Sequence, residues 1–385
     1  MDKITDPATG LDFLDKLREN NQNKGKTFDD LSWFLEQRAR EQGVPIHGQF
    51  ELTPLCNFDC KMCYAHLTKE QVAGRNLLTT EQWKDLMRQA YDLGMYQATL
   101  TGGECLTYPG FEELYLYLHS LGCEINVLTN GYLLDDRWVE FFKQHMPAKI
   151  QITLYGHDED SYERVTGHRS FGRVRHNIER IKESGLPLIL TVTPSVYLGK
   201  AVLETIRTAK NLCDAVQVSS SLFIPRKETG RADHEDEIES DLYIQIYRLM
   251  NEMEGRESKE VPEELLPEVG GPFHECTERG ILCGGGRSGF VIDWKGRMIP
   301  CNQLEQIESY PLRDGVREAW NHINLVVNNW PRVPECRGCP YYNACDTCPA
   351  VMARFEQPGK QPLALCRKTK YMVRNGIRRI PACDY

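Results

Sequence analysis

The 385-residue sequence predicts an α/β protein in which parallel βα units are followed by a cysteine-rich domain. Between about residues 48 and 220, short apolar segments alternate with helical patterns, which is typical of a parallel sheet with crossover helices. The 15 cysteines are unevenly spread: three lie within residues 56–63 and nine lie in the last 110 residues. Structural cysteines would scatter, so we expect one metal site near the start and more towards the end.

The composition is that of an ordinary globular protein, with 41% hydrophobic and 26% charged residues. No apolar run approaches the roughly 18 residues of a membrane span, and the first residues lack a secretory signal pattern. We therefore expect a cytoplasmic protein without a membrane partner. The net charge of −9 argues against a nucleic-acid partner.

Residues 1–47 are expected to form an N-terminal helical segment, in which Thr27 and Asp30 resemble a capping box and an apolar stripe ends at Gly43. Strands are expected at 49–52, 97–101, 125–128, 149–154, 188–193 and 216–219. Helices are expected at 79–93, 111–121 and 135–145, after Ser170, and at 200–212. In parallel βα folds the functional residues lie on loops after the carboxyl ends of the strands.

Two further boundaries follow from composition. Six of the nine residues 233–241 are acidic, so we expect 233–275 to be an exposed bridging segment after a barrel unit at 48–232. Residues 276–385 combine short segments, Gly-rich turns and Cys pairs. We expect this domain to have little apolar core and to be held together by bound metal.

The first cysteine cluster, Cys56, Cys60 and Cys63, follows the first predicted strand. Thiolates bind soft metals and iron–sulfur clusters. A structural zinc site needs a fourth ligand, which His66 could supply. Three thiolates without an obvious fourth favour a 4Fe–4S cluster with one open iron.

The C-x3-C-x2-C spacing resembles the signature of radical S-adenosylmethionine (radical SAM) enzymes. The resemblance implies a partial (β/α)6 TIM barrel whose open iron binds S-adenosylmethionine. One electron, from a low-potential donor such as ferredoxin or flavodoxin, would cleave it to methionine and a 5′-deoxyadenosyl radical. That radical would abstract a substrate hydrogen. Relatives usually carry an aromatic residue before the third cysteine, whereas here it is Met62, with Tyr64 just after.

Further motifs resemble the family's S-adenosylmethionine site. Gly102-Gly103-Glu104 ends the second strand, and Asn130 and Thr153 close the third and fourth. A turn at 129–131, and simple packing of Thr193, are the competing interpretations. The resemblance implies these cofactor contacts: Tyr64, Gly102, Gly103, Glu104, Asn130, Thr153 and Thr193.

The C-terminal cysteines resemble a SPASM domain, which carries two auxiliary 4Fe–4S clusters. The resemblance assigns Cys276, Cys283, Cys301 and Cys348 to the first cluster, and Cys336, Cys339, Cys345 and Cys366 to the second. Two residues, rather than the usual three, separate the third and fourth cysteines of the C-terminal run. A pair of four-cysteine zinc sites is the alternative.

Four cysteines remain unassigned. Cys123 and Cys213 flank predicted strands and are expected to be buried. Cys105 follows the Gly-Gly-Glu motif, and we favour a packing role because no base is identifiable beside it. Cys383 lies two residues before the end of the sequence.

The resemblance implies modification of a precursor peptide, and we expect an oxidative crosslink in the maturation of a ribosomally made peptide. Residues 158–167 resemble a region of peptide-modifying relatives. Sulfatase maturation is disfavoured because Asn302 stands where those relatives carry Asp. Residues 1–47 are short for a leader-binding domain, which weakens the peptide hypothesis. The alternatives are an oxidase or dehydrogenase of a small molecule or protein side chain, and a zinc-stabilised interaction protein.

Overall fold

The computed structural model describes most of the chain. The described residues are 27–219, 222–231, 239–256, 260–262, 266, 281, 283–331, 333–336, 339–341, 344–345, 348–352 and 360–378. Cys276 and Cys383 lie outside them, as do residues 1–26 of the predicted helical segment.

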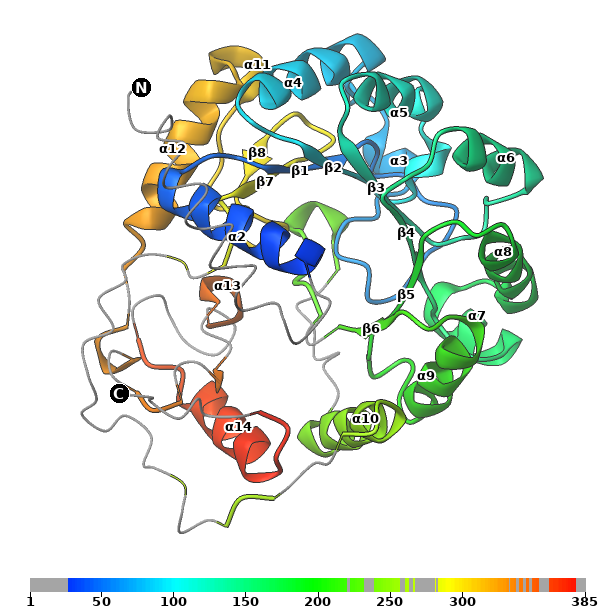
Figure 1. The fold of residues 1–385 in the computed structure, drawn as a ribbon, viewed down its shortest axis with the longest axis vertical. Helices are drawn as coiled ribbons and strands as arrows, with labels where there is room; N and C mark the ends of the chain where they lie inside the picture. The colour runs from blue at the N-terminus through cyan, green and yellow to red at the C-terminus, as the bar shows by residue number, and fades with distance from the viewer. Residues whose placement is uncertain are drawn as a thin grey trace.

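One sheet organises the molecule, with the strand order β6-β5-β4-β3-β2-β1-β7-β8. Its first six strands are β1 His47–Glu51, β2 Gln97–Thr101, β3 Glu124–Thr129, β4 Lys149–Thr153, β5 Leu188–Val192 and β6 Val216–Val218. These six are parallel and pair in chain order. The predicted strands are confirmed to within two residues, and the sheet curves into a partial barrel that does not close (Figure 1).

The crossover helices lie outside the sheet as an arc (Figure 1). They are α4 Thr80–Asp92, α5 Phe111–Ser120, α6 Asp136–Gln144, α8 Phe171–Glu183 and α9 Ala201–Leu212. All five were expected from their apolar periodicity. In α4, for example, Thr79 and Gln82 form a capping box, and Trp83 and Met87 are buried on one face.

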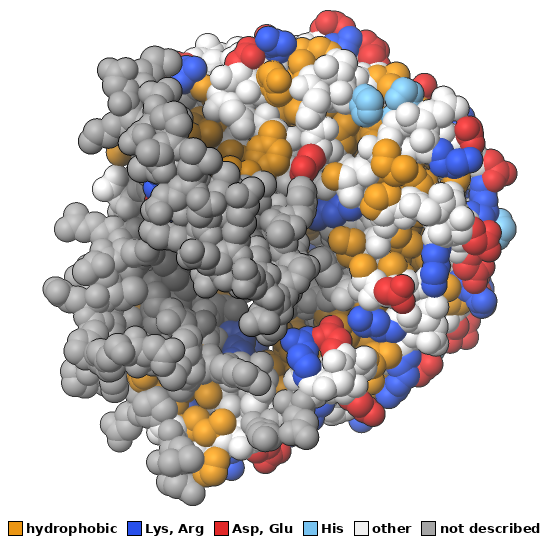
Figure 2. All heavy atoms as spheres, in the orientation of Figure 1, with side chains coloured by type: hydrophobic (Ala, Val, Ile, Leu, Met, Phe, Trp, Pro, Cys, Tyr) orange, Lys and Arg blue, Asp and Glu red, His pale blue; other side chains and the backbone are white. Residues whose placement is uncertain are grey.

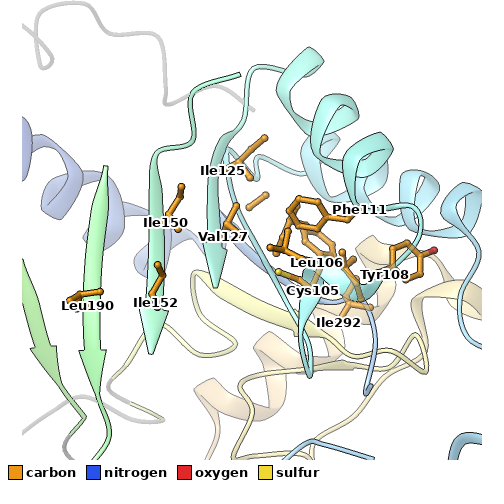
Figure 3. Packing of buried hydrophobic residues seen from close by; sticks show 14 of the residues in the cluster. Cys105, Leu106, Tyr108, Phe111, Ile125, Val127, Ile150, Ile152, Leu190 and Ile292 are labelled. Atoms are coloured by element: carbon orange, nitrogen blue, oxygen red, sulfur yellow. The ribbon is translucent and has the colours of Figure 1, made fainter. Parts of the chain in front are cut away.

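Strand side chains alternate between two environments. In β3 the burial alternates residue by residue, and Ile125 and Val127 are almost fully buried. They continue sideways into Ile150, Ile152 and Leu190 on the next two strands, forming an apolar row (Figure 3). The intervening residues point to the other face of the sheet because successive side chains alternate. The outer face is therefore the core, and the inner face is left for the site.

Two strands that the sequence analysis missed extend the sheet beyond β1. Strand β7 (Gly289–Ile292) pairs parallel to β1, and β8 (Met298–Ile299) pairs antiparallel to β7. Helix α12 (Val316–Asn328) then adds Trp320 and Ile323 to the main core. The expectation of little apolar core beyond residue 276 is therefore wrong for 283–327. The strands escaped prediction because four and two residues are too few to show a period.

The predicted bridging segment also contains an ordered helix. In α10 (Ser240–Met253), Tyr243, Ile244 and Ile246 are buried, so this part is not an exposed linker. Helix α10 contacts α9 on one side and α14 (Leu363–Arg374) on the other. The short helices are α3 Lys69–Val72, α7 Glu159–Thr166, α11 Pro311–Asp314 and α13 Pro349–Met352. The domain boundaries themselves stay predictions.

Over the described part of the chain, no helix combines the length and apolarity needed to cross a membrane. The described face in Figure 2 carries Lys and Arg interspersed with Asp and Glu. We see no broad single-sign patch on that described face.

Helix α2 (Thr27–Gln42) is tied to the sheet by one carboxylate. Glu36 lies 2.7 Å from His47 Nε2 and 2.9 Å from Arg40 Nε, and it accepts a hydrogen bond of 2.5 Å from Ser288. Burial alone would raise the pKa of Glu36, but hydrogen bonds from His47 and Ser288, with the nearby cations, lower it from 4.5 to about 2. The charged carboxylate therefore stabilises the folded protein.

We predict that Glu36→Gln lowers the free energy of unfolding at pH 7 by about 1–2 kcal/mol, since it removes a charge-assisted hydrogen-bond centre. The contribution of Glu36 is complete above its ordinary pKa of 4.5 and is lost as the pH falls towards 2. Anaerobic urea unfolding, followed by tryptophan fluorescence, should show the difference from wild type shrinking below pH 4.5. A difference that stays constant down to pH 3 would contradict this account.

Candidate active site

A cavity of about 340 Å3 opens at the carboxyl ends of the parallel strands. Cys56, Cys60 and Cys63 all line it. Of the predicted cofactor contacts, Tyr64, Gly102, Gly103, Asn130, Thr153 and Thr193 also line it. The sequence motifs therefore converge on one site, as expected for the carboxyl ends of parallel strands. The most distant of them, Cys56 and Thr193, are 137 residues apart in the sequence.

The cluster loop, residues 52–68 between β1 and α3, is held by its backbone. Asp59 N–H donates to Thr166 O at 3.1 Å and Lys61 N–H donates to Val165 O at 3.0 Å. These acceptors end helix α7, so the segment that resembles peptide-modifying relatives supports the cluster loop. Arg231 also donates to the carbonyl oxygens of Cys60 and Lys61. The cysteine backbone is thus fixed from two sides.

The two motif glycines bring β2 against the cluster loop. Gly102 has φ +152°, and a Cβ there would lie 2.5 Å from the carbonyl oxygen of Thr53. A Cβ on Gly103 would lie 2.3 Å from the carbonyl oxygen of Leu55. Gly103 N–H also donates to Thr53 O at 2.7 Å. Both positions therefore require glycine for the approach of two backbones, in addition to facing the cavity.

Glu104 differs from the other predicted contacts because it is not among the lining residues. Its carboxylate is about 1% exposed and accepts from Thr129 Oγ1 at 2.8 Å, Asn130 N at 2.8 Å and Leu106 N at 3.1 Å. Burial raises the pKa of Glu104, while these hydrogen bonds oppose the rise. Glu104 therefore anchors the end of β3, and its contact with the cofactor stays a prediction.

The side chain of Asn130 links the end of β3 to the cluster loop. Its Nδ2 donates to Asn57 Oδ1 at 2.8 Å and lies 3.6 Å from Cys56 Sγ. The turn at 129–131 and a site role are thus compatible. Cys105, in contrast, is fully buried in the core, which confirms its packing role (Figure 3). Cys123 and Cys213 are buried as expected.

Polar residues outside the set of predicted cofactor contacts complete the inner wall. They are Gln49, Thr101, Gln151, Thr191, Ser219 and Asn302. Thr191 Oγ1 and Asn302 Oδ1 are buried without a hydrogen-bond partner, so they are available to a bound molecule. Asp, Glu, Lys and Arg do not occur among the described residues that line the cavity. Alternation along β4, starting from Thr153, could have found Gln151.

The sequence analysis also missed a buried ion pair beside the cavity. Arg226 and Glu51 are each about 1% exposed and form two hydrogen bonds of 2.6 and 2.9 Å. Burial would lower the pKa of Arg226, but the charge of Glu51 more than offsets this and raises it. Tyr64 O–H donates to Glu51 at 3.2 Å, and burial raises the pKa of Tyr64, so its phenol stays neutral.

The thiols of the cluster loop suit a multi-iron cluster. No three His, Cys, Asp or Glu side chains converge closely enough to hold a single metal ion anywhere in the described residues. The three cysteines instead line a cavity. His66 lines the same cavity, and its Nδ1 lies 3.3 Å from Asp59 Oδ1. Burial, together with the neighbouring Glu104 charge, raises the pKa of Cys56 to about 12. Thiolates there need a positive counter-charge, such as bound iron.

The described C-terminal cysteines fall into two groups. Burial, and to a smaller extent the negative charge of Cys348 and Cys283, raises the pKa of the Cys301 thiol to about 11. Burial, and to a smaller extent the negative charge of Cys366, Cys345 and Cys339, raises the pKa of the Cys336 thiol to about 12. The described cysteines form no disulfide. The assignment of these cysteines to two auxiliary clusters stays a prediction, and Cys276 lies outside the described residues.

Comparison with known proteins identifies the barrel. The sequence profile of the radical SAM superfamily matches residues 50–225. These residues form a radical SAM domain. The match begins in β1, just before the cluster loop, and ends beyond β6. The family of this domain implies a 4Fe–4S cluster and S-adenosylmethionine as cofactors.

Curated relatives of the radical SAM domain differ in what they do. The chain is 26% identical over 324 residues to an AdoMet-dependent heme synthase from Methanosarcina barkeri, covering 78% of this chain and 90% of that protein. It is 26% identical over 271 residues to the sporulation killing factor maturation protein SkfB of Bacillus subtilis, covering 70% and 62%. It is 24% identical over 311 residues to a PqqA peptide cyclase from Xanthomonas axonopodis pv. citri, covering 77% and 80%.

A solved structure shares the fold over nearly the whole chain. Streptococcus suis SuiB bound to S-adenosylmethionine superposes with a TM-score of 0.66 at 16% identity, covering 94% of this chain and 88% of that chain. The similarity therefore extends beyond the radical SAM domain into the C-terminal cysteine-rich region.

We predict that Glu104→Gln destabilises the protein by about 1–3 kcal/mol, because a carboxamide N–H2 would face a buried donor. Thermal unfolding of anaerobically purified protein measures this loss. Glu183→Gln, on the exposed face of α8, serves as the matched control and should leave the midpoint unchanged. Equal midpoints for the two variants would show that the Glu104 hydrogen bonds do not hold the end of β3.

Proposed function

We propose that this chain is a radical SAM enzyme that acts on a precursor peptide and forms an oxidative crosslink during its maturation. The observation that carries the proposal is the convergence of Cys56, Cys60 and Cys63 with the strand-end polar residues on one cavity. The three cysteine thiols and the polar wall of the cavity together suit a 4Fe–4S cluster with bound S-adenosylmethionine.

Each residue of the site has a defined task in this proposal. The three loop cysteines would hold a 4Fe–4S cluster, and such a cluster would supply the electron for reductive cleavage of S-adenosylmethionine. The backbone of Gly102 and Gly103, with Tyr64, Asn130, Thr153 and Thr193, orients S-adenosylmethionine in the cavity. Glu104 holds Asn130 in place through the 2.8 Å hydrogen bond from its backbone N–H.

An oxidative crosslink removes two hydrogens from the peptide. One would leave as a hydrogen atom to the radical derived from S-adenosylmethionine, and the other would leave as a proton to solvent and an electron. The two C-terminal cysteine groups are suited to hold auxiliary 4Fe–4S clusters that accept this electron. A low-potential ferredoxin or flavodoxin is the expected electron donor. An epimerisation, which is redox-neutral, would not need the auxiliary clusters.

A peptide substrate is favoured by two relatives, of which one is named a killing factor maturation protein and the other a PqqA peptide cyclase. The uncharged lining of the cavity favours a neutral side chain or backbone Cα–H at the point of reaction, because a charged group would be desolvated without a partner. A reaction on a small molecule is the second candidate, since a relative that the match covers to 90% of its length is a heme synthase.

We predict that the anaerobically reconstituted protein binds about eleven to twelve irons per chain, as three 4Fe–4S clusters require. Iron and zinc quantification, with the visible absorbance of the brown protein, measures the count. About four irons accompanied by zinc would contradict the auxiliary clusters. A colourless zinc protein without iron would instead indicate a zinc-stabilised interaction protein.

We predict that Cys60→Ala abolishes formation of 5′-deoxyadenosine from S-adenosylmethionine in the presence of dithionite. The variant should lose about four irons, because a single 4Fe–4S cluster is affected. Cys123→Ala removes a buried cysteine that does not line the cavity and should retain the activity. A Cys60→Ala protein that still forms 5′-deoxyadenosine would defeat the proposed mechanism.

We predict that a short peptide encoded beside the gene loses two hydrogen masses when incubated with the reduced enzyme and S-adenosylmethionine. If that peptide is deuterated at the reacting carbon, the label should appear in 5′-deoxyadenosine by mass spectrometry. Denatured enzyme is the control. An unchanged peptide, together with conversion of an iron-free or iron-loaded tetrapyrrole, would favour the second candidate.

A further inference from the structure

The buried ion pair of Glu51 and Arg226 connects chain segments that are far apart in sequence. Glu51 is the last residue of β1, and Arg226 follows β6. The guanidinium offers two parallel donors to the carboxylate, at 2.6 and 2.9 Å. A buried ion pair is often no more stabilising than apolar side chains of similar size. Fold stability alone is therefore a weak explanation for this pair.

One side of the pair holds the cluster loop. Tyr64 O–H donates to Glu51 Oε1 at 3.2 Å, and the backbone N–H of Arg226 donates to the backbone carbonyl oxygen of Tyr64 at 3.0 Å. The Arg226 guanidinium carbon also lies 5.3 Å from the centre of the Tyr64 ring. Tyr64 is thus fixed at its hydroxyl, ring and carbonyl, and it is covalently joined to Cys63.

The other side of the pair faces the loop after β8. Arg226 Nε is buried without a hydrogen bond, and it lies 3.7 Å from the carboxylate oxygen Oε2 of Glu305. Glu305 is also 3.3 Å from Arg297, which in turn pairs with the fully buried Asp293 at 2.9 Å. The same loop carries Cys301 and Asn302, which is part of the cavity wall.

We propose that Glu51 and Arg226 are positioning residues, which set Cys63 and Tyr64 relative to the cavity and align the loop of Asn302 with them. Neither side chain lines the cavity, so neither is a catalytic residue. The inference rests on the proposed function, because it assigns the pair a task towards the cluster and S-adenosylmethionine. The planar guanidinium is essential, since an ammonium group cannot make the two parallel bonds.

The test compares Arg226→Lys, which keeps the charge, with wild type. Arg226→Lys should bind as much iron as wild type, while the KM for S-adenosylmethionine in the cleavage assay rises about 10–100-fold. The EPR change that S-adenosylmethionine causes in the reduced cluster should weaken or broaden. Tyr64→Phe removes the hydrogen bond to Glu51. It should change the KM and the EPR signal in the same direction as Arg226→Lys, but by a smaller amount. Arg313→Lys, in an exposed pair with Asp314, is the matched control.

Hydrogen–deuterium exchange of the anaerobically reconstituted protein provides a readout independent of activity. Arg226→Lys should increase exchange in residues 60–66 and 301–305 and leave helix α5 unchanged. Wild-type exchange, KM and EPR behaviour in Arg226→Lys would overturn the proposal. If Arg226→Lys fails to fold by circular dichroism, wild-type behaviour of Tyr64→Phe would overturn it instead. An inactive wild-type protein without iron would contradict the proposed function itself.

Discussion

The parallel pairing of β1 with β2 on one side and β7 on the other is the constraint on which the site depends. Strand β1 leads into the cluster loop and β2 leads into Gly102 and Gly103. Strand β7 leads through β8 to Cys301 and Asn302. Because parallel strands present their carboxyl ends at one edge, the loops after β1 and β2 must meet there. Asn302 follows the antiparallel strand β8 and also lines the cavity. A register shift in β1 would displace all of them at once.

Backbone contacts, rather than side-chain packing alone, hold the cluster loop at that edge. Gly102 and Gly103 allow β2 to touch the loop, the end of α7 provides two carbonyl acceptors, and Arg231 provides donors. The loop cysteines consequently have little freedom before any cluster is bound. This pre-organisation suits a site in which three thiols must present themselves to one cluster while a cavity beside it stays open.

The inner wall of the partial barrel complements this loop chemically. Its hydroxyl and amide groups can orient a polar cofactor and a neutral substrate group, and some, such as Thr191 Oγ1, have no partner within the protein. The ionisable groups Glu51, Arg226 and Glu104 lie behind the wall, where Glu51 pairs with Arg226 and Glu104 accepts hydrogen bonds from Thr129, Asn130 and Leu106. Charges therefore act on the geometry of the site and stay out of the space where a radical would react.

The sequence alone determined the six parallel strands, the five crossover helices and the identity of most cavity-lining motifs, because periodicity, glycine stops and cysteine spacing are local signals. The tertiary structure decided what depends on distant segments meeting. Strands β7 and β8 are too short to leave a periodic pattern, and only their pairing beside β1 makes them part of the sheet. Likewise, Glu51 and Arg226 lie 175 residues apart, and no local pattern indicates that two buried charges satisfy each other.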